Sequence, residues 1–117
     1  MAETVDTAVP PARAAELIEG GAQLIDVRRS YEWEAGRLAG ARHIEMNELT
    51  AAAESIDRAR PVLFYCRAGN RSGMAADAFR EAGYDAYHLA GGVQAWAEQG
   101  LGLEPKDGEV RDPLPPS

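Results

Sequence analysis

The chain has little cysteine and no excess of basic residues, and both shortages exclude classes of function. A single cysteine, Cys66, rules out an internal disulfide and a zinc site built from several thiolates. With 12 basic and 19 acidic residues, the net charge is -7, so we expect no nucleic-acid partner. The two histidines form no recognisable metal-ligand pattern, and we expect no metal and no other cofactor.

Long apolar runs are also missing. No segment approaches the length that crosses a membrane, and the first 14 residues lack the basic and apolar stretches of an export signal. We therefore expect no membrane partner and a cytoplasmic location, although a chain that had lost its signal would look the same.

The 117 residues fit one globular domain. We expect this domain at 9–104, between a flexible N-terminus at 1–8 and a proline-rich C-terminal tail at 105–117.

Short apolar segments alternate with helical patterns along the chain. Strands are expected at 23–27, 62–65 and 84–89, and the segment 38–44 is expected to form a turn that leads into a short strand. Helices are expected at 11–19, 31–35, 48–55, 72–82 and 93–99, with Ser30 and Asn47 as two of the N-caps. This alternation predicts an α/β fold with a mostly parallel sheet and helices on both faces. Ligands in such folds bind beyond the carboxyl ends of the strands, where Cys66, Arg28 and the turn at 91–92 all fall.

The segment 61–72, PVLFYCRAGNRS, places Cys66 between a buried strand and a helix. A cysteine reacts as the thiolate, and three features favour that form here. The helix points its positive end at the loop, Gly69 lets successive amides face inward, and Arg67 and Arg71 add positive charge. The same cradle would hold a small anion beside the sulfur. Taken alone, Cys66 would be an inert core residue, but its surroundings favour a nucleophile acting on a small anion.

Asp26 lies inside an apolar run, and an ionised carboxylate there needs a partner. Arg28 follows two residues later, so we favour a structural ion pair over a simple strand-end cap. We do not expect Asp26 to act as a catalytic acid.

Three motifs in order resemble the rhodanese-like family of thiosulfate sulfurtransferases. The segment 66–72 is similar to that family's active-site loop. The segment 26–28, with Glu32, Trp33 and 36–41, is similar to its first signature, and 89–92, with Trp96 and Gly100, to its closing one. The similarity covers about 10–103 and departs at Arg37 and Ala39, where the family usually has histidine and proline. It implies an α/β, rhodanese-like fold with a central, mostly parallel five-stranded sheet and helices on both faces.

The resemblance also implies a sulfurtransferase. Cys66 would take the outer sulfur of thiosulfate, or of a persulfide donor, and pass it to cyanide or to a protein or low-molecular-weight thiol. Asp26, Arg28 and Glu32 would brace the loop without touching the donor. No second cysteine is present to resolve a persulfide, so the sulfur must leave to another molecule. The donor would be bound by the loop residues Arg67, Ala68, Gly69, Asn70, Arg71 and Ser72.

Two other functions stay open. Cysteine phosphatases and arsenate reductases use a C-x5-R loop, which would place arginine at position 72. This chain has Ser72 there and Arg71 one position earlier, which makes a tighter cradle and disfavours this class. A non-catalytic rhodanese-like module that binds a partner is the third hypothesis. Many such modules lack the cysteine, whereas this chain keeps Cys66 with both arginines.

Overall fold

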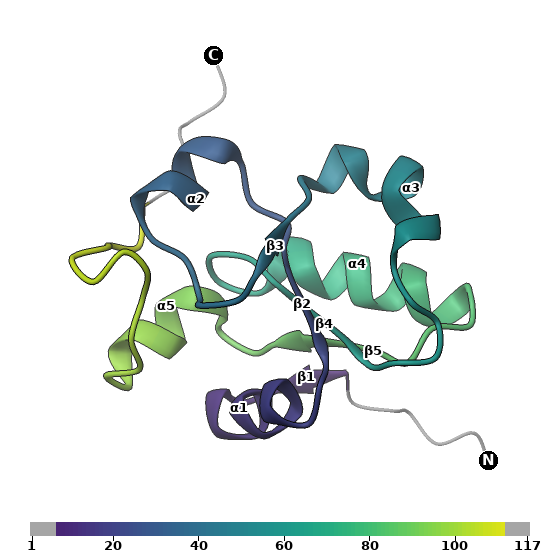
Figure 1. Cartoon of the computed structure of the whole chain (residues 1–117), viewed down its shortest axis with the longest axis horizontal. Coiled ribbons are helices and arrows are strands. Elements are labelled where there is room, and N and C mark those ends of the chain that lie inside the picture. Colours follow the sequence, from purple (N-terminus) through teal and green to yellow (C-terminus); the bar gives the residue numbers. More distant parts are fainter. Residues whose placement is uncertain (1–6, 112–117) are drawn as a thin grey trace.

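A five-stranded sheet forms the centre of the molecule, in a computed structural model that describes residues 7–111. Its strand order is β1-β5-β4-β2-β3, and all four pairings are parallel (Figure 1). The expected α/β fold is therefore confirmed. The strands are β1 (Ala8–Val9), β2 (Gln23–Asp26), β3 (Arg42–His43), β4 (Val62–Tyr65) and β5 (Ala86–Leu89).

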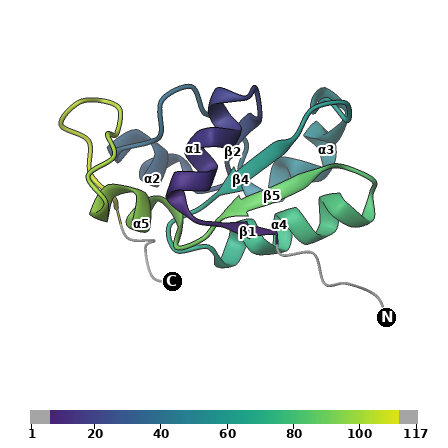
Figure 2. The same cartoon turned by 90° about the horizontal axis from the view of Figure 1, so that it is seen from below.

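Helices cover both faces of the sheet, with α1 and α4 on opposite sides (Figure 2). The central strand β4 is buried on both faces, so its residues alternate between two cores. Phe64 packs with Phe79 of α4, and Leu63 packs with Ala14 of α1 and Val93 of α5. The helices are α1 (Pro11–Glu19), α2 (Ser30–Ala35), α3 (Leu49–Ala52), α4 (Asn70–Glu81) and α5 (Gly92–Glu98), with 3-10 turns η1 (Met46–Glu48) and η2 (Ala53–Ser55) around α3.

Several boundaries differ from the sequence expectation. Helix α4 begins at Asn70 rather than Ser72, because Gly69 adopts a φ of 111° and turns the chain two residues earlier. Asn47 does not cap the helix expected at 48–55: it lies inside η1, the first of three short turns. Ser30 is the first residue of α2 rather than its cap, since the carboxylate of Glu32 accepts the N–H of Arg29 at that end.

The N-terminal boundary also differs, because Ala8 belongs to β1 and pairs with His88 of β5. At the other end, residues after α5 are tied to the segment that follows α2. Arg37 and Glu104 form an antiparallel bridge with N···O distances of 2.8 and 2.7 Å, and Glu109 donates to the carbonyl of Ala35 at 2.8 Å. The first part of the expected tail, up to 111, thus packs on the domain, and 112–117 lie outside the described residues. Among the described helices, none is long and apolar enough to cross a membrane.

Candidate active site

Cys66 follows β4 directly and its side chain is almost completely buried, with 1% exposure. The start of α5 holds the backbone of Cys66 and of the next residue. Val93 N–H donates to the carbonyl of Cys66 at 2.9 Å, and Gln94 N–H donates to the carbonyl of Arg67 at 3.1 Å. Gly92 makes this approach possible, since a Cβ there would collide with both carbonyl oxygens. The turn at 91–92 therefore packs directly against the backbone of Cys66 and Arg67.

Two backbone N–H groups and one hydroxyl surround the sulfur of Cys66. The N–H of Gly69 lies 3.1 Å from Sγ, the N–H of Ser72 lies 3.4 Å away, and the Ser72 hydroxyl also lies at 3.4 Å. Gly69 is the N-cap of α4, so these groups belong to the positive end of a 12-residue helix. Such an arrangement stabilises negative charge on the sulfur.

A pocket of about 150 Å3 opens beside the sulfur. Its size suits a small anion, and two of its side chains are arginines, Arg67 and Arg71. Gly69 and Ser72 lie behind the sulfur and contact it through the groups described above. An adjacent pocket of about 230 Å3, beside Arg29 and Met46, shares Arg71 with the first. The residues that line the smaller pocket are Cys66, Arg67, Ala68, Asn70 and Arg71.

Arg71 is held by Glu32 of α2 through two hydrogen bonds of 2.9 Å. Glu32 is fully buried, and the N–H of Arg29 donates to the same carboxylate at 3.0 Å. Burial alone would raise the pKa of Glu32, but the hydrogen bonds from Arg71 and Arg29 outweigh it and hold that pKa below its usual value. The hydrogen bonds to Glu32 likewise raise the pKa of Arg71. Glu32 therefore holds the guanidinium of Arg71, which lines the pocket beside the sulfur.

The ion pair expected for Asp26 is confirmed. Arg28 Nη2 lies 2.7 Å from the Asp26 carboxylate, and both side chains have 0% exposure. Burial by itself would lower the pKa of Arg28, but hydrogen bonding and charge from Asp26 hold it above the usual value. Arg28 also donates to the carbonyl of Gly36 at 2.7 Å. This pair thus fastens the chain after α2 to the end of β2, at the same edge of the sheet as Cys66.

One residue near the site was not predicted from the sequence. His88 places Nδ1 3.3 Å from the hydroxyl of Ser72. The contact joins β5 to the first turn of α4, across 16 positions of sequence. No local pattern could have indicated it, because strand register and helix placement together bring the two side chains into contact.

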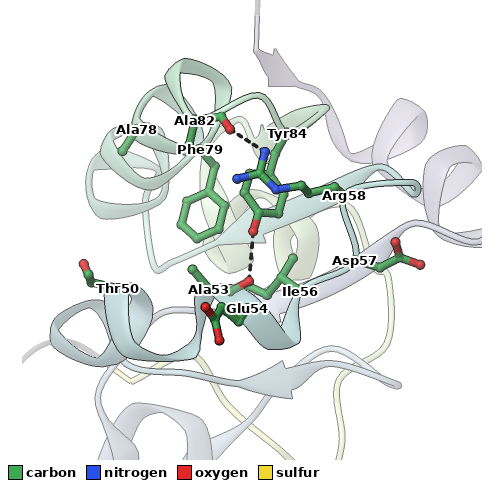
Figure 3. A pocket seen from close by; sticks show the side chains of 10 residues that line it. All are labelled: Thr50, Ala53, Glu54, Ile56, Asp57, Arg58, Ala78, Phe79, Ala82 and Tyr84. Carbon is green, nitrogen blue, oxygen red and sulfur yellow. Dashed lines mark hydrogen bonds between the residues drawn. The ribbon is translucent and has the colours of Figure 1, made fainter.

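A larger cavity lies elsewhere. It measures about 690 Å3 and is formed by η2, the end of α4 and the segments that precede β4 and β5, at the amino edge of the sheet (Figure 3). Arg58 lies over the ring of Tyr84 there, 4.4 Å from its centroid, and donates to the carbonyl of Ala82. Cys66 is at the opposite edge, so this cavity takes no part in the site. Within residues 7–111, no group of three or more metal-ligating side chains occurs.

Comparisons with known proteins point to one family. A family model described as a rhodanese-like domain matches residues 10–99. The uncharacterized protein YqhL of Bacillus subtilis (strain 168) is 42% identical over 76 residues, which make up 64% of this chain and 60% of that relative. The match to it thus spans less than two thirds of its length. Thiosulfate sulfurtransferase GlpE of Pseudomonas paraeruginosa (strain DSM 24068 / PA7) is 34% identical over 89 residues, 75% of this chain and 81% of the relative.

Solved structures agree with this assignment. A rhodanese-related protein from Thermoplasma volcanium superposes with a TM-score of 0.77 at 27% identity, covering 82% of this chain and 95% of that one. The parallel sheet, the cysteine loop after β4 and the matched range all coincide with the resemblance found in the motifs. The chain belongs to the family of rhodanese-like domains.

Proposed function

We propose that the protein is a sulfurtransferase that carries sulfane sulfur as a persulfide on Cys66. The observation that supports this most strongly is the arrangement around Sγ: two backbone N–H groups donate to it, the Ser72 hydroxyl contacts it, and a small pocket with two arginines opens beside it. One relative is named a thiosulfate sulfurtransferase, and the match to this chain covers 81% of its length. Its name supports thiosulfate as the donor. A persulfide is the alternative donor, since it also carries a sulfane sulfur and a negative charge.

The first step is a displacement at the outer sulfur of thiosulfate. The Cys66 thiolate forms a bond to that sulfur, the sulfur–sulfur bond of the donor breaks, and its electron pair leaves with sulfite. Arg67 and Arg71 would bind the sulfonate oxygens, and Arg71 is already oriented by Glu32. Charge balances without a proton, because one thiolate and one dianion become one persulfide anion and one dianion.

The second step returns the enzyme to its resting form. A thiolate or cyanide attacks the outer sulfur of the persulfide, and the electron pair of the broken bond remains on Cys66 as its thiolate. The amides of Gly69 and Ser72 would stabilise the negative charge in both forms. A protein or low-molecular-weight thiol is the proposed acceptor, and a reducing cytoplasmic compartment, which supplies such thiols, is the proposed location.

Mass spectrometry after treatment with thiosulfate tests the proposal directly. We expect the intact protein to gain one sulfur atom, to lose it on addition of cyanide with release of thiocyanate, and to show neither change as Cys66→Ala. No sulfur gain from thiosulfate or from a persulfide donor would instead favour a non-catalytic module. Hydrolysis of an aryl phosphate that Cys66→Ser abolishes would favour a phosphatase.

A further inference from the structure

The hydroxyl of Ser72 lies among three groups that compete for its proton. Sγ of Cys66 is 3.4 Å from Oγ, the carbonyl oxygen of Gly69 is 3.3 Å away, and Nδ1 of His88 is 3.3 Å away. A hydroxyl has one proton to donate and two lone pairs with which to accept. Whether the sulfur receives a side-chain hydrogen bond therefore depends on what the other two groups do.

The carbonyl of Gly69 is the weaker competitor. It already accepts the N–H of Gly73 at 2.9 Å, and it is neutral, whereas a thiolate or persulfide sulfur is charged and a stronger acceptor. The imidazole of His88 is different because Nδ1 accepts in one tautomer and donates in the other. An accepting Nδ1 would draw the proton away from the sulfur. A donating Nδ1 would occupy a lone pair of Oγ and leave the proton for the sulfur.

Packing fixes the position of this imidazole. Helix α4 lies along β5 (Figure 1). Two glycines at the start of this helix face His88: Gly69, its N-cap, and Gly73 in its first turn. A Cβ at Gly73 would lie 3.4 Å from both Cε1 and Nε2 of the ring, and a Cβ at Gly69 would lie 3.8 Å from Cε1. The ring thus sits directly against the helix backbone, where a larger residue at 73 would press on it. Its Nδ1 is thereby kept near the Ser72 hydroxyl.

We propose that His88 is a positioning residue that donates from Nδ1 to Oγ of Ser72 and so directs the Ser72 proton to the sulfur of Cys66. The sulfur, as thiolate or persulfide, then receives this hydrogen bond in addition to the two amides of the loop. His88 touches neither donor nor acceptor and acts only through Ser72. The inference rests on the proposed role of Cys66 as the nucleophile, but its test needs no sulfur transfer.

Cys66 is the only cysteine, so the ultraviolet absorbance of its thiolate and its rate of alkylation by iodoacetamide can be followed against pH without interference from other thiols, with Cys66→Ala as the blank for tyrosine absorbance. His88→Leu removes the donor, and we expect the midpoint of thiolate formation to move up by about 0.5–1 pH unit, with about 3–10-fold slower alkylation below it. His88→Asn places an amide N–H near the position of Nδ1, and we expect it to restore most of the difference.

Two comparisons separate this role from a structural one. His43→Leu alters the other histidine, which contacts the Arg28 carbonyl and the Trp33 ring, and we expect the wild-type midpoint. In a Ser72→Ala background, where the relay is absent, His88→Leu should add no further shift. Circular dichroism and thermal unfolding verify that each variant is folded.

Three results would overturn the proposal: a folded His88→Leu protein with the wild-type midpoint, an equal shift in the Ser72→Ala background, or a folded His88→Asn protein that restores nothing. If the titration behaves as expected but no donor loads sulfur onto Cys66, the relay stands and the proposed sulfurtransferase function fails. The two ideas are therefore tested separately.

Discussion

The two carboxylate oxygens of Glu32 each bind one terminal nitrogen of Arg71, at 2.9 Å. The two partners differ in environment, because Glu32 has 0% exposure and the Arg71 side chain has 29%. The buried carboxylate thus fixes one edge of the guanidinium. Arg71 also lines the small pocket to which Cys66 belongs. An arginine oriented before its anion arrives loses less side-chain entropy on binding.

Because of this difference in burial, we expect the free energy of unfolding to fall by different amounts when Arg71 or Glu32 is replaced. Arg71→Ala leaves a buried carboxylate without its counter-charge, and we expect a loss of about 3–5 kcal/mol in the free energy of unfolding. Glu32→Gln leaves a partly solvated cation, and we expect about 1–3 kcal/mol. Urea unfolding at pH 7 measures both, with the exposed Glu34→Gln on the same helix as a control. A larger loss for Glu32→Gln would contradict the argument.

The same pair predicts how stability depends on acid. The native pKa of Glu32 lies below its ordinary value of 4.5, so the unfolded chain binds its proton at a higher pH than the folded one. Its contribution to stability is complete above pH 4.5 and is lost as pH falls through the native pKa. The difference in unfolding free energy between wild type and Glu32→Gln should therefore be largest near neutral pH and shrink below 4.5. An unchanged difference down to pH 3 would argue against the ion pair.

The parts of the molecule that could be predicted from the sequence are those with local causes. Alternating apolar and helical patterns sufficed for the α/β class, and Asp26 with Arg28, two positions apart, sufficed for a buried ion pair. A glycine and a helix after a lone cysteine indicated the amide cradle. Each of these signals lies within a few residues of the feature it predicts.

The rest depends on contacts between distant segments. Strand β1 has only two residues, too few to show an alternation of apolar and polar side chains, so the sequence does not indicate its pairing with β5. Glu32 and Arg71 are 39 positions apart, so no local pattern links them. From the sequence, Arg67 and Arg71 are equally available to a donor, and only the structure shows that Arg71 is the one held by Glu32. Similarly, His88 meets Ser72 only because α4 packs along β5.

Tyr65 offers a test of how the segment after α2 is held. Its buried hydroxyl accepts the N–H of Leu38 at 3.1 Å, and burial, reinforced by the charge of Asp26, raises the pKa of Tyr65 far above its usual value. Tyr65→Phe keeps the ring beside Arg28 but leaves the buried N–H of Leu38 without an acceptor. We expect a loss of about 1–3 kcal/mol in unfolding free energy.

The matched control is Tyr84→Phe at the opposite edge of the sheet. The hydroxyl of Tyr84 donates to the carbonyl of Ala53 at 2.9 Å, and both residues line the cavity of about 690 Å3, from which water can replace the hydroxyl. We expect that substitution to cost less than about 1 kcal/mol. Thermal unfolding measures both variants. Equal losses of unfolding free energy would show that the hydrogen bond to Leu38 stabilises the fold no more than the bond to Ala53 does.

Gly92 tests whether α5 shapes the cysteine loop. It has a φ of 61°, and a Cβ there would collide with the carbonyl oxygens of Cys66 and Arg67. Gly100 has a φ of 77°, but a Cβ added there would meet no atom within 4 Å, so alanine at 100 carries only the conformational cost of about 1–2 kcal/mol. Gly92→Ala should add about 1–3 kcal/mol for overpacking. Because the loop must shift to admit the methyl group, we also expect slower alkylation of Cys66 in Gly92→Ala and an unchanged rate in Gly100→Ala. Equal unfolding free energies and equal alkylation rates in the two variants would mean that the loop geometry does not depend on this close approach.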